Sequence, residues 1–163
     1  MAAEPRTPRI ILMLAVIERF VIGGLMAAIT FLTLIQVIWR YGLNQPLTWS
    51  EEVARYCFVW VTLIGAATLL RLKDSHPELD SLRNRLAPIF RAAVDVFSRL
   101  TIVLCSLAIS IGGFRMIHLH IDQLSPSLEI PMWWIYLSMA VPPLIGIFWI
   151  LWRAKFGPVE DQQ

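Results

Sequence analysis

Four long apolar runs with almost no charged residues dominate this sequence, and they lie at 20–39, 56–70, 100–117 and 132–152. As an α-helix, a run of about 20 residues is about 30 Å long, which matches the hydrocarbon thickness of a bilayer. Charged residues make up only 16% of the 163 residues, whereas soluble domains average about a quarter. The sequence therefore predicts an all-α membrane protein and argues against a soluble globular domain.

We expect one membrane domain that covers residues 1–163 and contains four transmembrane helices. The expected bounds of these helices are about 18–40, 50–71, 94–117 and 131–152. Between the second and third spans, an amphipathic helix at about 78–87 is expected to lie on the membrane surface, because Leu79, Leu82 and Leu86 share one helical face. At the N-terminus no cleavable signal is expected, since the first apolar run is too long for one.

The distribution of Lys and Arg predicts the orientation of these spans. Eleven of the 14 lysines and arginines lie in the N-terminal segment, the middle loop and the C-terminal segment, and the other three are Arg40, Arg55 and Arg115. Both termini are therefore expected in the cytoplasm, with the two short loops on the outer side. The basic middle loop is also expected to bind anionic lipid headgroups.

The first span carries small residues at helical spacing. Gly23 precedes Ala27 by four residues, and Gly24 precedes Ala28 by the same interval. Such pairs let the backbone of another helix approach closely within a membrane. We therefore expect this span to offer a packing face.

A polar cluster stands at the start of the second span. Thr48 and Glu51 have capping-box spacing, which predicts that a helix begins there. Either Glu51 or Glu52 can meet Arg55 on a helix. The charges are either solvated at the membrane interface or form a buried polar contact, within the subunit or with a partner helix. The aromatic residues close to them predict either an interfacial belt or a packing surface, and they are Trp49, Tyr56 and Trp60.

Charged residues also mark the cytoplasmic edge. Arg91, Asp95 and Arg99 are spaced at i, i+4 and i+8 and form a polar ladder at the start of the third helix. These side chains either reach the cytoplasmic surface or make a salt-bridged contact with another subunit. Glu18 superficially resembles the membrane carboxylate of small proton-coupled exporters, but it is expected at the cytoplasmic edge and not in mid-membrane.

The histidines and cysteines do not predict a metal or haem site. His76 is expected on the cytoplasmic side, whereas His118 and His120 are expected on the outer side and would point apart on a helix. Cys57 and Cys105 lie within apolar runs and lack metal-ligand spacing. No nucleophile–base pattern or phosphate-binding glycine loop is present either. The residues therefore predict a four-helix membrane scaffold, without catalysis, that needs a partner.

The segment Trp49–Tyr56, which reads WSEEVARY, resembles the small membrane subunit of tripartite ATP-independent periplasmic (TRAP) transporters, the DctQ-like family. Further matching residues are Arg71, His76 and Asp80, followed by the segment Ser125–Pro131. The resemblance covers nearly the whole chain, including four helices and cytoplasmic termini.

This resemblance implies a scaffold subunit of a sodium-coupled secondary transporter that imports organic acids, such as carboxylates or sulfonates. It implies two protein partners, a large membrane subunit that holds the substrate and sodium sites and a periplasmic solute-binding protein. The location implied is the inner membrane of a bacterial or archaeal cell. No cofactor is expected in this chain, and nucleic acid is not expected as a partner.

The resemblance also suggests roles for residues. The network expected to shape the contact with the large subunit consists of Trp49, Glu51, Glu52, Arg55, Tyr56 and Trp60. The residues expected at the cytoplasmic boundary and the surface helix are Arg71, His76, Asp80, Arg91, Asp95 and Arg99. The residues expected to touch the binding protein are Asn44, Gln45, His118, His120, Asp122 and Glu129.

Two alternatives belong to other classes of membrane protein. A stand-alone small transporter would work as a homo-oligomer, but the missing mid-membrane carboxylate argues against it. A membrane anchor of a redox or signalling complex would bring a cofactor or a soluble enzyme partner, which an absorbance spectrum would reveal. The polar segment 157–163 suggests that the large subunit is a separate gene product.

Overall fold

The computed structural model describes residues 9–71 and 88–156 of the chain. The helices in these residues are α1 (Arg9–Gly42), α2 (Thr48–Leu69), α4 (Pro88–Leu119) and α5 (Trp133–Phe156). All four are long and apolar enough to cross a membrane. The prediction of an all-α membrane protein with four transmembrane helices is therefore confirmed, whereas the surface helix expected at about 78–87 lies outside the described residues.

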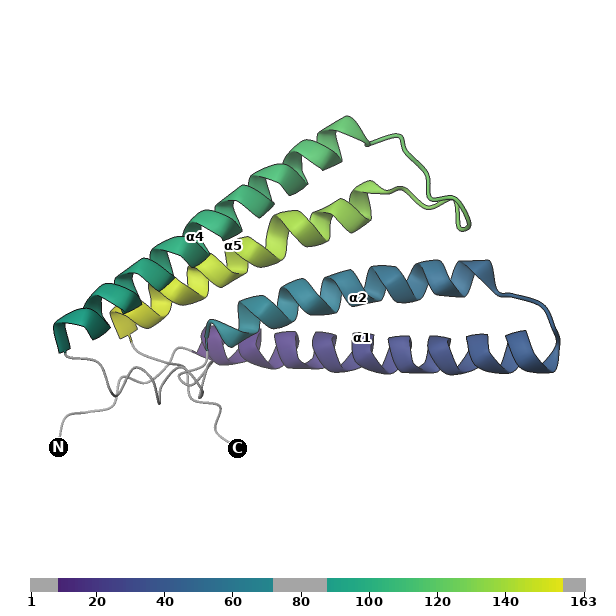
Figure 1. The fold of residues 1–163 in the computed structure, drawn as a ribbon, viewed down its shortest axis with the longest axis horizontal. Coiled ribbons are helices and arrows are strands. Elements are labelled where there is room, and N and C mark those ends of the chain that lie inside the picture. The colour runs from purple at the N-terminus through teal and green to yellow at the C-terminus, as the bar shows by residue number, and fades with distance from the viewer. Residues whose placement is uncertain (1–8, 72–87, 157–163) are drawn as a thin grey trace.

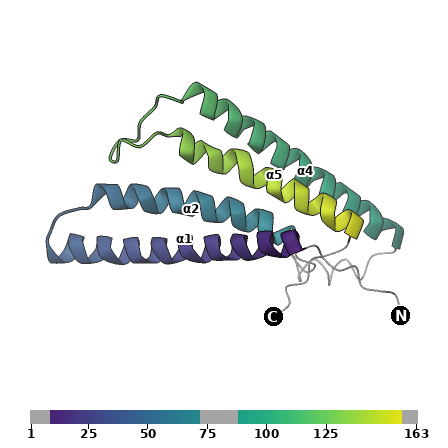
Figure 2. The ribbon, with the colours of Figure 1, turned by 180° about the vertical axis from the view of Figure 1, so that it is seen from behind.

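The helices form two antiparallel hairpins, α1 with α2 and α4 with α5 (Figure 1). Across the molecule the order is α1, α2, α5, α4, because α2 packs against both α1 and α5. The hairpins converge where α1 begins and α5 ends, and they diverge toward the two connecting loops, as the view from behind also shows (Figure 2). We call the convergent end the terminal end and the opposite end the loop end.

The last helix begins later than the sequence suggested. Pro131 does not open α5 but forms an isolated antiparallel bridge with Leu124, and α5 begins at Trp133. The amide of Met132 donates to the carbonyl of Gln123 at 2.8 Å. Backbone groups just before the helix are thus engaged in this loop, and the helix begins after them.

Small residues bring α4 and α5 into close contact. Ser110 on α4 is buried, and its hydroxyl donates to the carbonyl oxygen of Ala140 on α5 at 2.6 Å. A Cβ atom placed on Gly113 would lie 2.7 Å from the backbone nitrogen of Ala140. The backbones therefore approach each other more closely than larger side chains would allow, as is usual at helix contacts within membranes.

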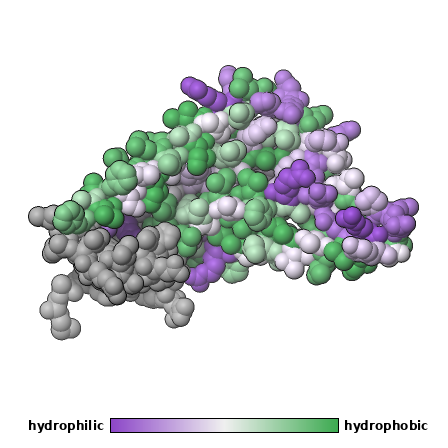
Figure 3. Space-filling view, viewed as in Figure 1, coloured by the Kyte–Doolittle hydropathy of each residue, from purple (hydrophilic) through white to green (hydrophobic). Residues whose placement is uncertain are grey.

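The buried apolar core lies at the terminal end. Ile11 and Trp149 are its buried members, and Leu70, Ile145 and Trp152 pack against them. Elsewhere the large apolar side chains are mostly exposed on the helices, and apolar atoms cover much of the helical surface in Figure 3. A surface of this kind suits lipid or neighbouring apolar helices and not water.

The α4–α5 contact gives a stability prediction with a matched control. Gly113→Ala is expected to lower the free energy of unfolding by about 1–3 kcal/mol, because the new methyl group meets the α5 backbone. Gly112→Ala is expected to be neutral or to stabilise the protein by about 0.5–1 kcal/mol, because nothing lies within 4 Å of a Cβ atom there. Unfolding midpoints in detergent micelles measure both changes, and equal midpoints would contradict the close helix contact.

Candidate functional site: the polar contact at the loop end

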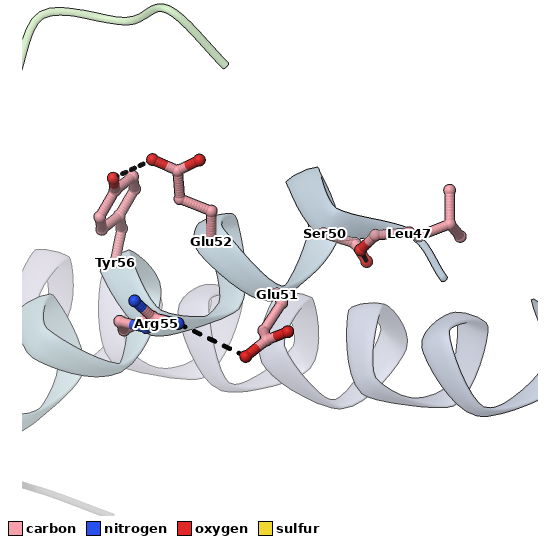
Figure 4. A network of polar contacts seen from close by, with 6 residues as sticks. All are labelled: Leu47, Ser50, Glu51, Glu52, Arg55 and Tyr56. Carbon is pink, nitrogen blue, oxygen red and sulfur yellow. Dashed lines mark hydrogen bonds and ion pairs between the residues drawn. The ribbon is translucent and has the colours of Figure 1, made fainter. Parts of the chain in front are cut away.

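Helix α2 begins directly after the turn that connects it to α1. Asn44 adopts a positive φ of 54° in this turn. Thr48 is the first helical residue, and Leu47 occupies the cap position without a side-chain hydrogen bond. The capping box expected from Thr48 is therefore not formed, although the helix does begin there. Instead, the buried Ser50 hydroxyl donates to the carbonyl oxygen of Leu47 at 2.8 Å (Figure 4).

Glu52 connects α2 to the loop between α4 and α5. Its side chain points toward this loop, and the residue is only 7% exposed (Figure 4). The Tyr56 hydroxyl donates to Oε1 of Glu52, and the amide N–H of Ser127 donates to Oε2 at 3.0 Å. The Tyr56 oxygen also lies 3.6 Å from Sδ of Met132. One carboxylate thus joins the two hairpins at the loop end, because it accepts a charge-assisted hydrogen bond from Ser127 while Tyr56 of its own helix holds its other oxygen.

Glu51 and Arg55 form a separate pair on another face of the helix (Figure 4). Their side chains are 71% and 68% exposed, and Nη2 of Arg55 lies 3.4 Å from Oε1 of Glu51. In water such a pair contributes little stability, about 0.3–0.5 kcal/mol. Of the two partners that the sequence allowed for Arg55, the structure selects Glu51, while Glu52 bonds to Tyr56 and Ser127. Both groups of the exposed pair can be reached by another protein.

The aromatic residues expected in this network are divided as well. Trp60 packs against Trp134 of α5, with ring centroids 5.7 Å apart. The Trp60 indole nitrogen is buried and has no hydrogen-bond partner among the described residues. Trp49 is exposed. The sequence did not decide whether these aromatic residues form an interfacial belt or a packing surface. In the structure Trp60 packs against protein, whereas Trp49 is exposed.

The loop between α4 and α5 has its own hydrogen bonds. The Ser125 amide donates to the Ile130 carbonyl at 2.9 Å, and Glu129 adopts a positive φ of 54°. Five of the residues expected to touch the binding protein are exposed at the loop end, namely Asn44, Gln45, His118, Asp122 and Glu129. His120 is half-buried, and its ring centroid lies 5.4 Å from that of Tyr136. In the described part of the chain, no group of three or more His, Cys, Asp or Glu side chains could hold a metal ion.

A recess of about 460 Å³ lies between the start of α2 and this loop. Its lining residues are Thr48, Glu51, Glu52, Arg55, Tyr56, Pro126, Ser127 and Met132. The recess combines hydroxyl groups, two carboxylates and one guanidinium with the sulfur of Met132. Such groups can receive a polar side chain from a partner, and they do not form a nucleophile–base arrangement.

The residues expected at the cytoplasmic boundary lie at the terminal end where they are described. Arg71 is only 2% exposed, and its guanidinium lies 5.6 Å from the ring centroid of Trp149. Asp95 is half-buried and Arg99 is exposed. His76 and Asp80 lie outside the described residues. Arg91 lies in α4, but its side chain is not among those described.

Sequence reasoning missed the importance of Glu18. This residue is only 9% exposed. Its carboxylate accepts a hydrogen bond from the Trp149 indole at 2.8 Å and one from the Thr68 hydroxyl at 3.1 Å. Its Oε2 also lies 3.9 Å from Nε of Arg71. The sequence did contain a signal for this contact. Glu18 and Arg71 border different apolar runs, and charged side chains near lipid tend to pair.

The Glu52 contact predicts a local change in hydrogen exchange. Glu52→Ala removes the acceptor of the Ser127 N–H, and a hydrogen bond to a charged group is stronger than one between neutral groups. Amide exchange in the loop at 124–132 is therefore expected to rise by about tenfold, as measured by mass spectrometry in detergent or nanodiscs. Glu51→Ala is the matched control and is expected to leave exchange in this loop unchanged. Equal exchange in both variants would rule out Glu52 as the link.

Comparison with known proteins shows that the sequence of this chain matches a family. Residues 29–154 match the family described as "Tripartite ATP-independent periplasmic transporters, DctQ component". The match includes the second part of α1 from residue 29 onward, all of α2, the α4–α5 loop and the Glu52 contact, and it reaches almost to the end of α5.

Three curated relatives agree with this match. The C4-dicarboxylate TRAP transporter small permease protein DctQ of Rhodobacter capsulatus is 31% identical over 118 residues, which are 71% of this chain and 50% of the relative. Its counterpart in Vibrio cholerae is 37% identical over 95 residues, covering 58% of this chain and 39% of the relative. The sialic acid TRAP transporter permease protein SiaT of Haemophilus influenzae is 28% identical over 135 residues, covering 81% of this chain and 21% of the relative. The chain thus spans half or less of the length of these three proteins.

Proposed function

This chain belongs to the DctQ component family of TRAP transporters, and we propose that it is the non-catalytic scaffold subunit of a sodium-coupled transporter. In this proposal it works with a large membrane subunit and a periplasmic solute-binding protein. The complex imports organic acids, either carboxylates or sulfonates, across the inner membrane of a bacterium or archaeon. Substrate and sodium bind to the other subunits, and this chain carries no cofactor.

The exposed apolar surface is the observation that carries this proposal. Large apolar side chains remain exposed along α1 and α4, and examples are Phe20, Phe31, Phe97 and Leu104. Of the described residues, the buried carboxylates are Glu18 and Glu52, and both already accept hydrogen bonds from this chain's own donors. Such a chain is suited to packing against other helices in the membrane and is poorly equipped to bind a charged solute by itself.

The relatives support the substrate class and the division of labour. Their names include C4-dicarboxylate and sialic acid, both of which are organic acids. This chain matches only 21% of the longer permease protein SiaT. This ratio is consistent with a small subunit that acts together with a much larger membrane subunit.

Each surface of the chain has a proposed partner. The open face of α1 around Gly23 and Gly24, where nothing lies within 4 Å of an added Cβ atom, receives a helix of the large subunit. The exposed Glu51–Arg55 pair borders the same contact. The loop end faces the periplasm, where Asn44 and the α4–α5 loop meet the binding protein. Both termini lie in the cytoplasm, where basic residues contact anionic lipid headgroups.

Co-purification tests the scaffold role directly. The tagged chain is extracted from its native membrane in a mild detergent, and co-purifying proteins are identified and quantified by mass spectrometry. One much larger polytopic membrane protein in near-equal amount is the expected result. Recovery of the chain alone, while other membrane complexes of the same extract stay intact, would reject the scaffold role. Uptake by vesicles that contain only this chain would favour a stand-alone transporter.

A substitution on α1 separates the partner surface from the fold. Gly23→Leu is expected to reduce co-purification of the large subunit several-fold, because the new side chain would block close approach of a helix. The unfolding midpoint of the isolated chain should not fall, since nothing in the described residues lies within 4 Å of a Cβ atom added at Gly23. Gly23→Ala is the matched control, and a small side chain there should retain the partner. Undiminished recovery with Gly23→Leu would place the large subunit elsewhere.

A further inference from the structure

At Glu18, side chains of three of the described helices meet through polar contacts. Glu18 comes from α1, Thr68 comes from α2, and Trp149 comes from α5. Arg71, directly after α2, brings its Nε to 3.9 Å from the same carboxylate. The four residues, here called the Glu18 joint, are surrounded by the apolar core at the terminal end.

We infer that Glu18 is a positioning residue, which sets the angle between the α1–α2 and α4–α5 hairpins. The inference rests on the proposed scaffold function, because this angle determines where the loop end and the exposed faces meet the other subunits. In a membrane, apolar packing hardly distinguishes a neighbouring helix from lipid, so polar contacts and close packing decide the arrangement. The Glu18–Trp149 bond directly joins α1 to α5, which are not neighbours in the helix order.

A small rotation at the Glu18–Trp149 bond would produce a large displacement at the loop end of the hairpin. Along α5, Trp149 and Trp133 are separated by about 24 Å, because each residue adds about 1.5 Å. A rotation of about 12° at the joint would therefore move the far end of the hairpin by about 5 Å. Beyond the joint the hairpins diverge (Figure 1), and an apolar cavity of about 310 Å³ is lined by residues of α2, α4 and α5. Space between the hairpins is thus available for such a change.

The same contacts argue against Glu18 as a binding site for a transported cation. Both carboxylate oxygens already accept hydrogen bonds from Trp149 and Thr68. The guanidinium of Arg71, itself buried, faces the carboxylate, so an added cation would meet an existing positive charge. The charge of Glu18 is therefore used within the chain.

Spin-label distances test the inference on the full chain in nanodiscs. The two cysteines are first replaced by Ser, and labels are attached at Leu43 and Ile121. Both positions are exposed, and each lies in the loop of one hairpin. The reference chain is expected to give one narrow distance distribution.

The first test variant removes both charged side chains of the joint. Glu18→Leu combined with Arg71→Leu deletes both charges, and such replacements of buried pairs are often tolerated. The distance maximum is expected to shift by about 5 Å or the distribution to broaden by as much. If Glu18 only neutralised Arg71, the double variant would keep the reference distance, and the inference would be overturned. If this variant does not fold, Trp149→Phe decides the question, because it removes the indole N–H and keeps an aromatic ring. An unchanged distance in Trp149→Phe also overturns the inference.

Thr62→Val is the matched control for a hydroxyl deletion on α2. The Thr62 hydroxyl donates to the carbonyl of Phe58 in its own helix at 2.8 Å, whereas the Thr68 hydroxyl lies 3.0 Å from the carbonyl of Ile64 in its own helix and 3.1 Å from Oε2 of Glu18. Thr68→Val should therefore broaden the distances and Thr62→Val should not, and an equal response in both would contradict the role of the joint. These distances concern this chain alone, so they stand or fall independently of whether a large subunit co-purifies.

Discussion

In a bilayer an apolar side chain gains little by exchanging lipid for protein, and the arrangement of helices must depend on other contacts. In the described residues, close helix packing and buried carboxylates provide such contacts. Ser110 and Gly113 allow α4 and α5 to touch closely, and the carboxylates of Glu18 and Glu52 join the hairpins. The remainder of the apolar surface can then face lipid or a partner without disturbing the fold.

The two carboxylates act at opposite ends of the molecule and in different surroundings. Glu18 is enclosed by the apolar core, an indole and a guanidinium, and it joins helix to helix. Glu52 borders a polar recess and joins a helix to a loop through a backbone N–H. The first contact constrains the helix axes, whereas the second fixes the segment at which another protein can arrive.

The sequence was sufficient for the four helices, because an apolar run long enough to cross a bilayer has few other stable conformations. It also located the polar start of α2. It did not reveal that Glu51 and Glu52 have different partners, because helical spacing allows either acid to reach Arg55. The choice depends on Ser127, which is 75 positions away in the chain. Likewise, Glu18 and Trp149 are 131 positions apart, and no local pattern connects them.

The divergence of the hairpins has a consequence for the surrounding bilayer. Helices that lie close together at one end and apart at the other would displace unequal areas in the two leaflets (Figure 1). By itself, such a wedge would bend the lipid around it or alter lateral pressure in the leaflet at its broad end. A neighbour that tapers in the opposite sense would restore equal areas. Lipid elasticity would then favour association with a partner of complementary shape, even before any side chains are in contact.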